Sequence, residues 1–313
     1  MSIRISELAK RLGARLENAS VDSMVDALAM ADVAADNEVG FIPGVRALIS
    51  DAAGAVLVSV AQGQRNALVV DNVLLACARS SEWLRIRRNG EPRTRRASVL
   101  AESARIASGA YLGAGVHVGD NTVIAHGVVL GDGVTIGAHC RIDTGTVVCG
   151  EATIGNRVCI GAASSVGSEG FAFLRDGPAW CAMPAFGSVS IADDVTIRAH
   201  VVIHAGVLGD TVIAQGCILD SQVLIGHDSR IGPYSAIAGQ TAIAGAACVG
   251  RHCRIGGKVG VGEGVQIADR VTVTAMSMVT RSITDVGARY SSGWPAEPSR
   301  TWWRRVAQFR RPR

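Results

Sequence analysis

Seven histidines are the side chains of this sequence best suited to chemistry near neutral pH. An imidazole has an unperturbed pKa of about 6.5, so it can accept or release a proton under physiological conditions. The chain contains no G-x-S-x-G nucleophile elbow, no phosphate-binding P-loop and no H-E-x-x-H zinc motif. The histidines are His117, His126, His139, His200, His204, His227 and His252. Proton transfer or metal binding by histidine is therefore the chemistry to look for.

The elements that carry these histidines repeat every six residues. An aliphatic residue recurs at each sixth position from Ile106 to Val166 and again from Ile191 to Ile203. Four extra residues then shift the series, a feature called the slip below, and the series continues from Ile213 to Val273. A period of six fits neither a helix nor an alternating strand, but it is typical of a triangular coil in a parallel β-helix. The strict spacing argues against an ordinary β-sandwich. Each histidine lies beside an inward-facing position and is expected to point outward or to occupy a corner.

The predicted fold class is mainly β: a hexapeptide-repeat left-handed parallel β-helix with an N-terminal α/β domain and a short C-terminal helix. Residues 1–98 form the α/β domain, with a helix from Ile5 to Leu12 that Ser6 could cap, and a second helix from Asn72 to Leu84. Residues 99–280 form the β-helix, interrupted by an apolar insertion at 167–188. Residues 281–313 form a basic tail with a short amphipathic helix.

A metal centre is one alternative for the histidines. His200, His204 and His227 could bind a metal, as in hexapeptide-repeat carbonic anhydrases. A separation of four residues does not align two ligands in a solenoid of period six, and the similarity to those enzymes ends there.

Charge and composition indicate where the protein acts and what kind of partner it binds. The N-terminus lacks an apolar signal-peptide core, and no apolar stretch approaches the roughly 20 residues that a membrane span requires, so we expect a cytoplasmic protein. From Arg281 onward the chain holds eight arginines against Asp285 and Glu297. Such a basic tail is either solvated surface or a docking site for an acidic macromolecule.

The sequence around His227 is more specific than the repeats. The segment Leu219-Asp220-Ser221-Gln222-Val223-Leu224-Ile225-Gly226-His227-Asp228 resembles the catalytic coil of the UDP-3-O-(3-hydroxyacyl)glucosamine N-acyltransferases of lipid A synthesis. The resemblance extends over nearly the whole chain. It includes Ser2–Ala9, Ala67–Asn72, the insertion Val166–Phe173, and the distal segments Val271–Val279 and Tyr290–Pro295.

This resemblance implies transfer of a 3-hydroxyacyl chain from acyl carrier protein to the 2-amino group of a UDP-3-O-acylglucosamine. No cofactor is implied, because the acyl donor itself carries phosphopantetheine, and no metal is needed. A homotrimer is expected, since three copies of a triangular solenoid can bury their flat faces around one axis.

The resemblance also implies roles for individual residues. His227 is the expected general base, the Gly245 N–H the expected oxyanion donor, and Asp220 or Asp228 the residue that orients the imidazole. Met278 is expected to set acyl-chain length, with Phe41 and Phe171 in contact with substrate. Arg281, Arg304 and Arg305 are expected to bind acyl carrier protein.

The sequence departs from the family pattern at several places. The family's Gln-Ile-Ala-His is Leu224-Ile225-Gly226-His227 here, its Ile-Asp-Arg-Gly-Ala is Ile203-His204-Ala205-Gly206-Val207, and the C-terminal helical extension is short. A second, distal histidine of the family is replaced by Gly264, and the uridine-contact pattern F-x-x-N-P-x-Y is replaced by Phe41-Ile42-Pro43-Gly44-Val45-Arg46. Two further functions therefore stay open: an acetyl-coenzyme A-dependent sugar N-acetyltransferase, and a non-catalytic homologue that acts as a scaffold.

Overall fold

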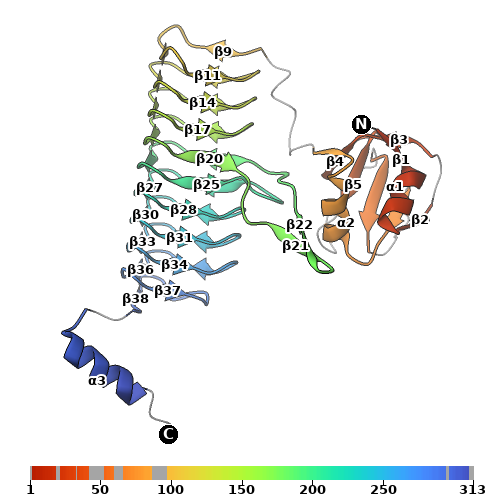
Figure 1. The fold of residues 1–313 in the computed structure, drawn as a ribbon. Helices are drawn as coiled ribbons and strands as arrows, with labels where there is room; N and C mark the ends of the chain where they lie inside the picture. Colours follow the sequence, from red (N-terminus) through yellow and green to blue (C-terminus); the bar gives the residue numbers. More distant parts are fainter. Residues whose placement is uncertain are drawn as a thin grey trace.

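The computed structural model describes residues 2–18, 22–32, 34–41, 53–59, 66–86, 97–293 and 296–309. A triangular prism of stacked coils makes up most of the chain, with a small α/β domain beside it and a helix at the distal end (Figure 1). Several sequence features lie outside the described residues: the linker Arg88–Arg96, the segment Ile42–Arg46, the pair Trp294 and Pro295, and Arg310, Arg311 and Arg313.

Three parallel sheets form the faces of the prism within residues 97–293, and nearly all their strands are two or three residues long. The first sheet contains β10 (Arg105–Ile106), β13 (Val123–Ile124), β16 (Arg141–Ile142), β19 (Cys159–Ile160), β24 (Thr196–Ile197), β27 (Ile218–Leu219), β30 (Ala236–Ile237), β33 (Arg254–Ile255), β36 (Thr272–Val273) and β38 (Arg289–Tyr290). The second contains β11 (Tyr111–Leu112), β14 (Val129–Leu130), β17 (Val147–Val148), β20 (Ser165–Ser168), β25 (Val202–His204), β28 (Leu224–Ile225), β31 (Ala242–Ile243), β34 (Gly260–Val261) and β37 (Met278–Val279). The third contains β9 (Val99–Leu100), β12 (His117–Val118), β15 (Thr135–Ile136), β18 (Thr153–Ile154), β23 (Val189–Ile191), β26 (Thr211–Ile213), β29 (Arg230–Ile231), β32 (Cys248–Val249) and β35 (Gln266–Ile267).

The aliphatic residue of each hexapeptide points into the prism. From Val118 to Val273 every member of the sixfold series is buried in one continuous core. Strands pair with the strand one coil away, so Ile225 pairs with Ile243 and Ile243 with Val261, a spacing of 18 residues. The predicted left-handed parallel β-helix is confirmed. Its coils continue past residue 280, because β38 adds one more strand to the first sheet.

Two irregularities interrupt the coils near the middle of the prism. The first is the insertion, which leaves the prism after β20 and forms a hairpin of β21 (Phe173–Asp176) and β22 (Ala179–Ala182). The second is the slip of four residues between β25 and β26. The polypeptide returns to the 18-residue spacing after each of them, so the core stays continuous.

The N-terminal domain contains a six-stranded sheet and two helices in the described residues. Its elements are β1 (Ile3–Arg4), α1 (Ile5–Leu12), β2 (Arg15–Glu17), β3 (Met24–Val25), β4 (Ala27–Met30), β5 (Glu38–Phe41), β6 (Ala55–Val58), β7 (Ala67–Val69), α2 (Val73–Ser80) and β8 (Arg85–Ile86). Asn72 caps α2 by accepting the Leu75 N–H at 3.0 Å. Ser6 is not the cap of α1, contrary to expectation, because the helix begins earlier; its N–H and hydroxyl both bond to Asp22.

The hairpin joins the N-terminal domain to the prism. Phe41 of β5 packs against Phe186, which follows the hairpin, with ring centroids 4.6 Å apart, and both side chains are fully buried. Arg79 of α2 donates to Asp176 at the hairpin tip, with an Nε–Oδ2 distance of 2.8 Å. Figure 1 shows the hairpin lying between the two parts of the molecule.

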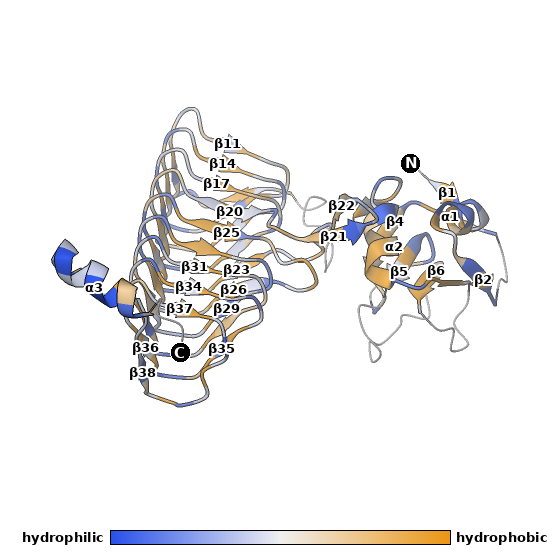
Figure 2. Cartoon of the chain, turned by 60° about the horizontal axis from the view of Figure 1, so that its bottom comes forward, coloured by the Kyte–Doolittle hydropathy of each residue, from blue (hydrophilic) through white to orange (hydrophobic). Residues whose placement is uncertain are grey.

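The C-terminal helix α3 (Ser299–Phe309) extends from the distal end of the prism (Figure 1). Hydrophilic residues cover most of it, whereas hydrophobic residues follow the strands of both domains (Figure 2). Trp303 is 64% exposed. None of its residues belongs to the hydrophobic clusters found in the described part of the chain.

Phe186 provides a test of this connection. Replacing Phe186 with Ala should lower the free energy of unfolding of the N-terminal domain by about 3–5 kcal/mol, because a fully buried aromatic ring leaves a cavity between domain and hairpin. The measurement is urea denaturation followed by a probe in that domain. Phe173→Ala is the matched control, since Phe173 is 43% exposed. Equal losses in the two variants would contradict a shared core.

Candidate active site

His227 lies at a corner of the prism, directly after β28. The preceding Gly226 N–H donates to the Ile243 carbonyl at 2.8 Å, and the His227 carbonyl accepts the Ala246 N–H at 2.8 Å. Both bonds link His227 to the next coil, so its backbone position is fixed by the solenoid. The following residue, Asp228, has a left-handed φ of 58° that turns the chain into the next face.

The imidazole of His227 is oriented by its neighbour. His227 Nδ1 lies 2.8 Å from Asp228 Oδ2, and the two side chains are only 17% and 20% exposed. An ionised carboxylate can only accept, so Nδ1 carries the proton of this bond. The other ring nitrogen, Nε2, is thereby left as the basic atom of the neutral imidazole.

The Asp228 carboxylate is held by the loop at which the repeat slips. Its oxygens accept the backbone N–H groups of Val207, Leu208 and Gly209 at 3.0, 3.0 and 2.9 Å. All three amides belong to the loop that makes the series slip by four residues. The irregularity in the repeat therefore builds a cradle of three donors around one carboxylate. The slip is visible in the sequence, but nothing local in the sequence indicates this role.

These contacts shift the pKa values of both groups. The pKa of His227 is raised, chiefly by its hydrogen bond to Asp228; burial opposes the rise, and the charges of Asp228 and Glu263 add to it. Burial is the largest single effect on the Asp228 carboxyl and raises its pKa, but the bonds from His227 and the three amides together outweigh it. The net pKa of Asp228 therefore lies below its ordinary value, and the carboxyl is ionised at neutral pH.

Gly245 lies directly beneath the imidazole, one coil further along. A Cβ at this position would be 2.6 Å from His227 Nε2 and 2.7 Å from Cε1, so only glycine fits. Its carbonyl accepts the Gly264 N–H at 2.9 Å. Its own N–H has no acceptor among the described residues. The residue one coil from the imidazole therefore carries a backbone N–H without an acceptor in the described chain, and an oxyanion site requires such a donor.

His204 and the insertion close one side of this corner. His204 ends β25, and burial together with the nearby His227 lowers its pKa. A Cβ on Gly170 would be 2.8 Å from His204 Nδ1, so the insertion passes directly against this ring. Phe171 follows, is 79% exposed, and packs against Phe173 with the rings tilted by 57° and their centroids 5.3 Å apart. A hydrogen bond to the Phe171 backbone also raises the pKa of His227, so Phe171 lies close to the site.

Asp220 lies at a different corner, and within the chain it does not orient the imidazole. Its carboxylate accepts the Ser221 N–H at 2.7 Å and the Gly239 N–H at 3.1 Å. It lines a hollow of about 730 Å³ on the first sheet, together with Arg198, Arg254 and Arg289. The reason is the fold: residues seven apart in a period of six belong to neighbouring corners. Asp228 alone of the two aspartates contacts His227.

Phe41 is a core residue, which overturns its expected place in contact with substrate. Its ring is 0% exposed and is covered by Phe186, so no ligand can reach the side chain without displacing that ring. The sequence did not reveal this, because the partner ring lies 145 residues further along, beyond any local pattern.

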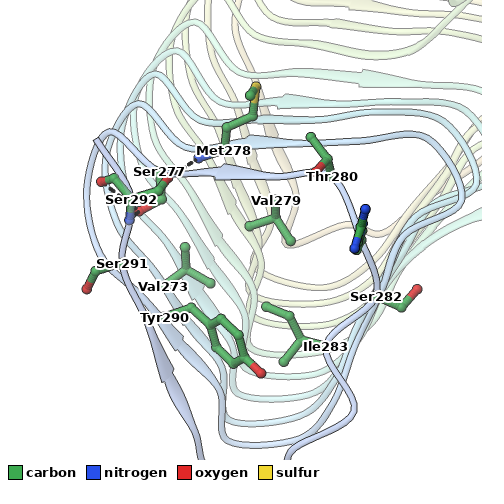
Figure 3. A pocket seen from close by; sticks show the side chains of 11 residues that line it. Val273, Ser277, Met278, Val279, Thr280, Ser282, Ile283, Tyr290, Ser291 and Ser292 are labelled. Atoms are coloured by element: carbon green, nitrogen blue, oxygen red, sulfur yellow. Dashed lines mark hydrogen bonds between the residues drawn. The ribbon is translucent and has the colours of Figure 1, made fainter. Parts of the chain in front are cut away.

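Met278 lies at the distal end of the His227 face and is 72% exposed. Figure 3 shows it on the outside of the last coils, where Val273, Val279 and Ile283 line the open end of the prism. A hollow of about 220 Å³ is formed there, with Arg281 and Tyr290 also in its wall. Met278 occupies the same outward column as Leu224, Ala242 and Gly260, each one coil apart.

The arginines of the tail that the structure describes, from Arg281 to Arg305, are exposed. Arg304 donates from Nε to the Arg300 carbonyl at 3.3 Å, and Arg305 pairs with Glu297. Arg281 lies at the start of this segment, beside Met278. The three arginines therefore follow one another along the distal end, and the structure brings none of them to His227.

Two negative findings concern the described residues only. No group of histidine, cysteine, aspartate and glutamate in them could hold a metal ion, and His200, His204 and His227 do not form one. Within the same ranges, no helix has the length and apolar character needed to cross a membrane.

Comparison with known proteins identifies relatives over the whole chain. Residues 97–132 match the family model described as bacterial transferase hexapeptide (six repeats). The UDP-3-O-acylglucosamine N-acyltransferase of Pseudomonas syringae pv. tomato is 36% identical over 99% of this chain and 92% of its own length. That of Pseudomonas putida F1 is 39% identical over 99% and 91%. A crystal structure of UDP-N-acetylglucosamine O-acyltransferase from Moraxella catarrhalis is 27% identical over 63% and 70%, with a TM-score of 0.39.

The bond between His227 and Asp228 predicts a pH dependence. If Nε2 is the base, the rate rises as His227 loses its proton, and the raised pKa places this acid limb above the ordinary histidine value. Asp228→Asn removes the charge that stabilises the imidazolium, so the pKa falls and the limb moves to lower pH, with a lower maximal rate. The measurement is kcat/KM from pH 5 to 9.

Asp220→Asn is the matched control for this prediction. It removes the other corner carboxylate, which does not touch the imidazole, and the acid limb should stay where it is. A limb that moves in Asp220→Asn and not in Asp228→Asn would overturn the assignment.

Proposed function

The chain belongs to the family of UDP-3-O-acylglucosamine N-acyltransferases and is an acyltransferase, and from this premise we propose that it acylates the 2-amino group of a UDP-3-O-acylglucosamine with His227 as general base. The observation that carries the proposal is the arrangement of three groups at one corner. Asp228 holds Nδ1, which leaves Nε2 as the basic atom, and Gly245, whose N–H has no acceptor among the described residues, lies next to the Nε2 edge of the ring. An amine that attacks a thioester needs this pair of a base and an oxyanion donor.

The proposed reaction passes through a tetrahedral adduct of the amine and the thioester. The amine nitrogen forms a bond to the thioester carbon, and its excess proton passes to His227 Nε2. The Gly245 N–H stabilises the oxyanion of the tetrahedral adduct. The carbon–sulfur bond then breaks, and the proton moves from His227 to the leaving thiolate. Asp228 stabilises the imidazolium that exists between these two transfers.

The outward column of the His227 face supports a long acyl chain on the donor. Ala242 and Gly260 are small, so the column carries little side-chain bulk beyond the site, and Met278 stands at its far end. We propose that the acyl chain lies along this column and that Met278 limits its length. A 3-hydroxyacyl group fits this path better than acetate, which would leave the column empty. Phe171 is placed to cover the substrate at the opposite side of the corner.

The proposed donor is acyl carrier protein, whose phosphopantetheine carries the acyl group, so the enzyme needs no cofactor of its own. The basic tail supports this donor, since acyl carrier proteins are acidic. The intact arrangement at His227 argues against a scaffold that has lost activity, even though Gly264 takes the place of a second histidine.

We further propose a cytoplasmic homotrimer that acts in lipid A synthesis. Exposed apolar side chains support self-association: Tyr111, Val129 and Val147 are stacked in one outward column and are 61%, 37% and 37% exposed. A column of this kind on a flat face is suited to burial against a second copy of the prism.

The central test compares two histidines of the same corner. His227→Ala should lower kcat by at least about 10²–10⁴-fold, which is the usual contribution of a general base. His204→Ala should lower it far less. Product is measured by mass spectrometry with a hydroxyacyl carrier protein and the UDP-amino sugar, and light scattering checks that each variant keeps the mass of the wild type. Equal and mild losses would mean that neither ring is the base.

The tail gives a test of the donor. Arg304→Glu combined with Arg305→Glu should raise KM for the acyl carrier protein donor several-fold, because reversed charges repel an acidic partner and steering is lost. The effect should shrink as salt screens the charges. A short acyl-pantetheine donor serves as the control and should react at an unchanged rate. Equal loss with both donors would assign the tail a structural role, and no loss with either would place docking elsewhere.

A further inference from the structure

Glu263 occupies the same corner position as His227 and Gly245. The three residues follow at intervals of 18, which is one coil each. Backbone bonds keep them in line: Ala246 N–H donates to the His227 carbonyl at 2.8 Å, and Gly264 N–H to the Gly245 carbonyl at 2.9 Å. With coils about 4.8 Å apart, the backbones of His227 and Glu263 are separated by about 10 Å.

The residue between His227 and Glu263 in this column is Gly245. Gly245 lies in the middle of the column and has no Cβ, and the edge of the imidazole that carries Nε2 lies over it. The charge of Glu263 reaches His227 and raises its pKa. The column therefore carries a basic nitrogen, a glycine and a carboxylate in consecutive coils, and the carboxylate is close enough for its charge to act on the imidazole.

The Glu263 carboxylate is available for a ligand. The residue is exposed, and its side chain makes no hydrogen bond or ion pair with any residue that the structure describes. The other charged or titratable groups around His227 are already engaged. Asp228 is held by three amides and the imidazole, and the partly buried His204 lies against the insertion.

We propose that Glu263 binds the amino group of the acceptor sugar and so selects an amine over a hydroxyl acceptor. One N–H of the amine donates to the Glu263 carboxylate while the other points to His227 Nε2. When the nitrogen attacks the thioester carbon it becomes positively charged, and the carboxylate stabilises that charge until Nε2 removes a proton. The remaining N–H stays on the amide product, and the proton on His227 goes to the thiolate. This inference rests on the proposed N-acyl transfer.

The charge of the acceptor explains why a carboxylate suits this position. A sugar amine is partly protonated near neutral pH, so a negative group attracts it before reaction as well as during attack. A neutral hydroxyl offers only an uncharged hydrogen bond at both stages. Hydrogen bonds that involve a charged group are stronger than neutral ones, and loss of one corresponds to about a tenfold to a hundredfold weakening.

The test measures binding and turnover with two acceptors. Calorimetry without donor compares the UDP-3-O-acylglucosamine with its analogue that carries a hydroxyl in place of the 2-amino group. In Glu263→Gln, we expect Kd for the amino acceptor to rise by about tenfold or more, kcat/KM to fall at least as far, and Kd for the hydroxyl analogue to stay within about twofold. Glu102→Gln, in an exposed position of the first coil, is the matched control and should change none of these values.

Three outcomes would overturn the proposal. Unchanged Kd values with lower turnover would mean that Glu263 acts only through the pKa of His227. An equal rise in Kd for both acceptors would mean that Glu263 does not distinguish an amine from a hydroxyl. Unchanged Kd and kcat/KM would mean that Glu263 is a solvated surface residue. If the wild-type enzyme fails to acylate the amino acceptor, the proposed function itself is wrong. If the wild-type enzyme acylates it and Glu263→Gln has the same Kd and kcat/KM, only the inference about Glu263 is wrong. Because Glu263 is exposed, both variants should keep the wild-type melting temperature, which excludes misfolding.

Discussion

Stacking of aliphatic side chains inside the prism fixes each coil at 18 residues, and the active-site geometry depends on that spacing. A buried residue at every sixth position leaves the backbone no freedom to change the length of a face without opening the core. Residues 18 apart are therefore held one coil apart at the same corner. His227, Gly245 and Glu263 come together for this reason, although no helix, loop or disulfide connects them.

The two places where the spacing fails are the places that build the site. The slip of four residues supplies the three amides that hold Asp228, and the insertion carries Gly170 and Phe171 against the histidines. The same insertion anchors the N-terminal domain through Phe186. A solenoid of perfect repeats would offer only identical corners, so a unique site requires such breaks.

Charge in the site is arranged around one imidazole. Asp228 stays ionised because four hydrogen bonds outweigh its burial, and it in turn makes His227 more basic. With Gly264 in place of the distal histidine, His227 is the histidine whose ring lies against Gly245 in the described coils. Glu263 adds negative charge on the far side of Gly245, where a nitrogen nucleophile gains positive charge.

The sequence by itself determined the solenoid, the N-terminal α/β domain and the basic helix, because the repeat is local and periodic. It also singled out His227 as the candidate base, because the segment around it is specific. It also located the insertion and the slip. Only the tertiary structure decided which aspartate orients the imidazole. Asp220 and Asp228 are close in sequence, but they lie at different corners of the prism. It likewise showed that Phe41, expected to contact substrate, is a core residue. Both answers depend on side chains from distant coils meeting in space, and no local pattern of residues encodes which of them will meet.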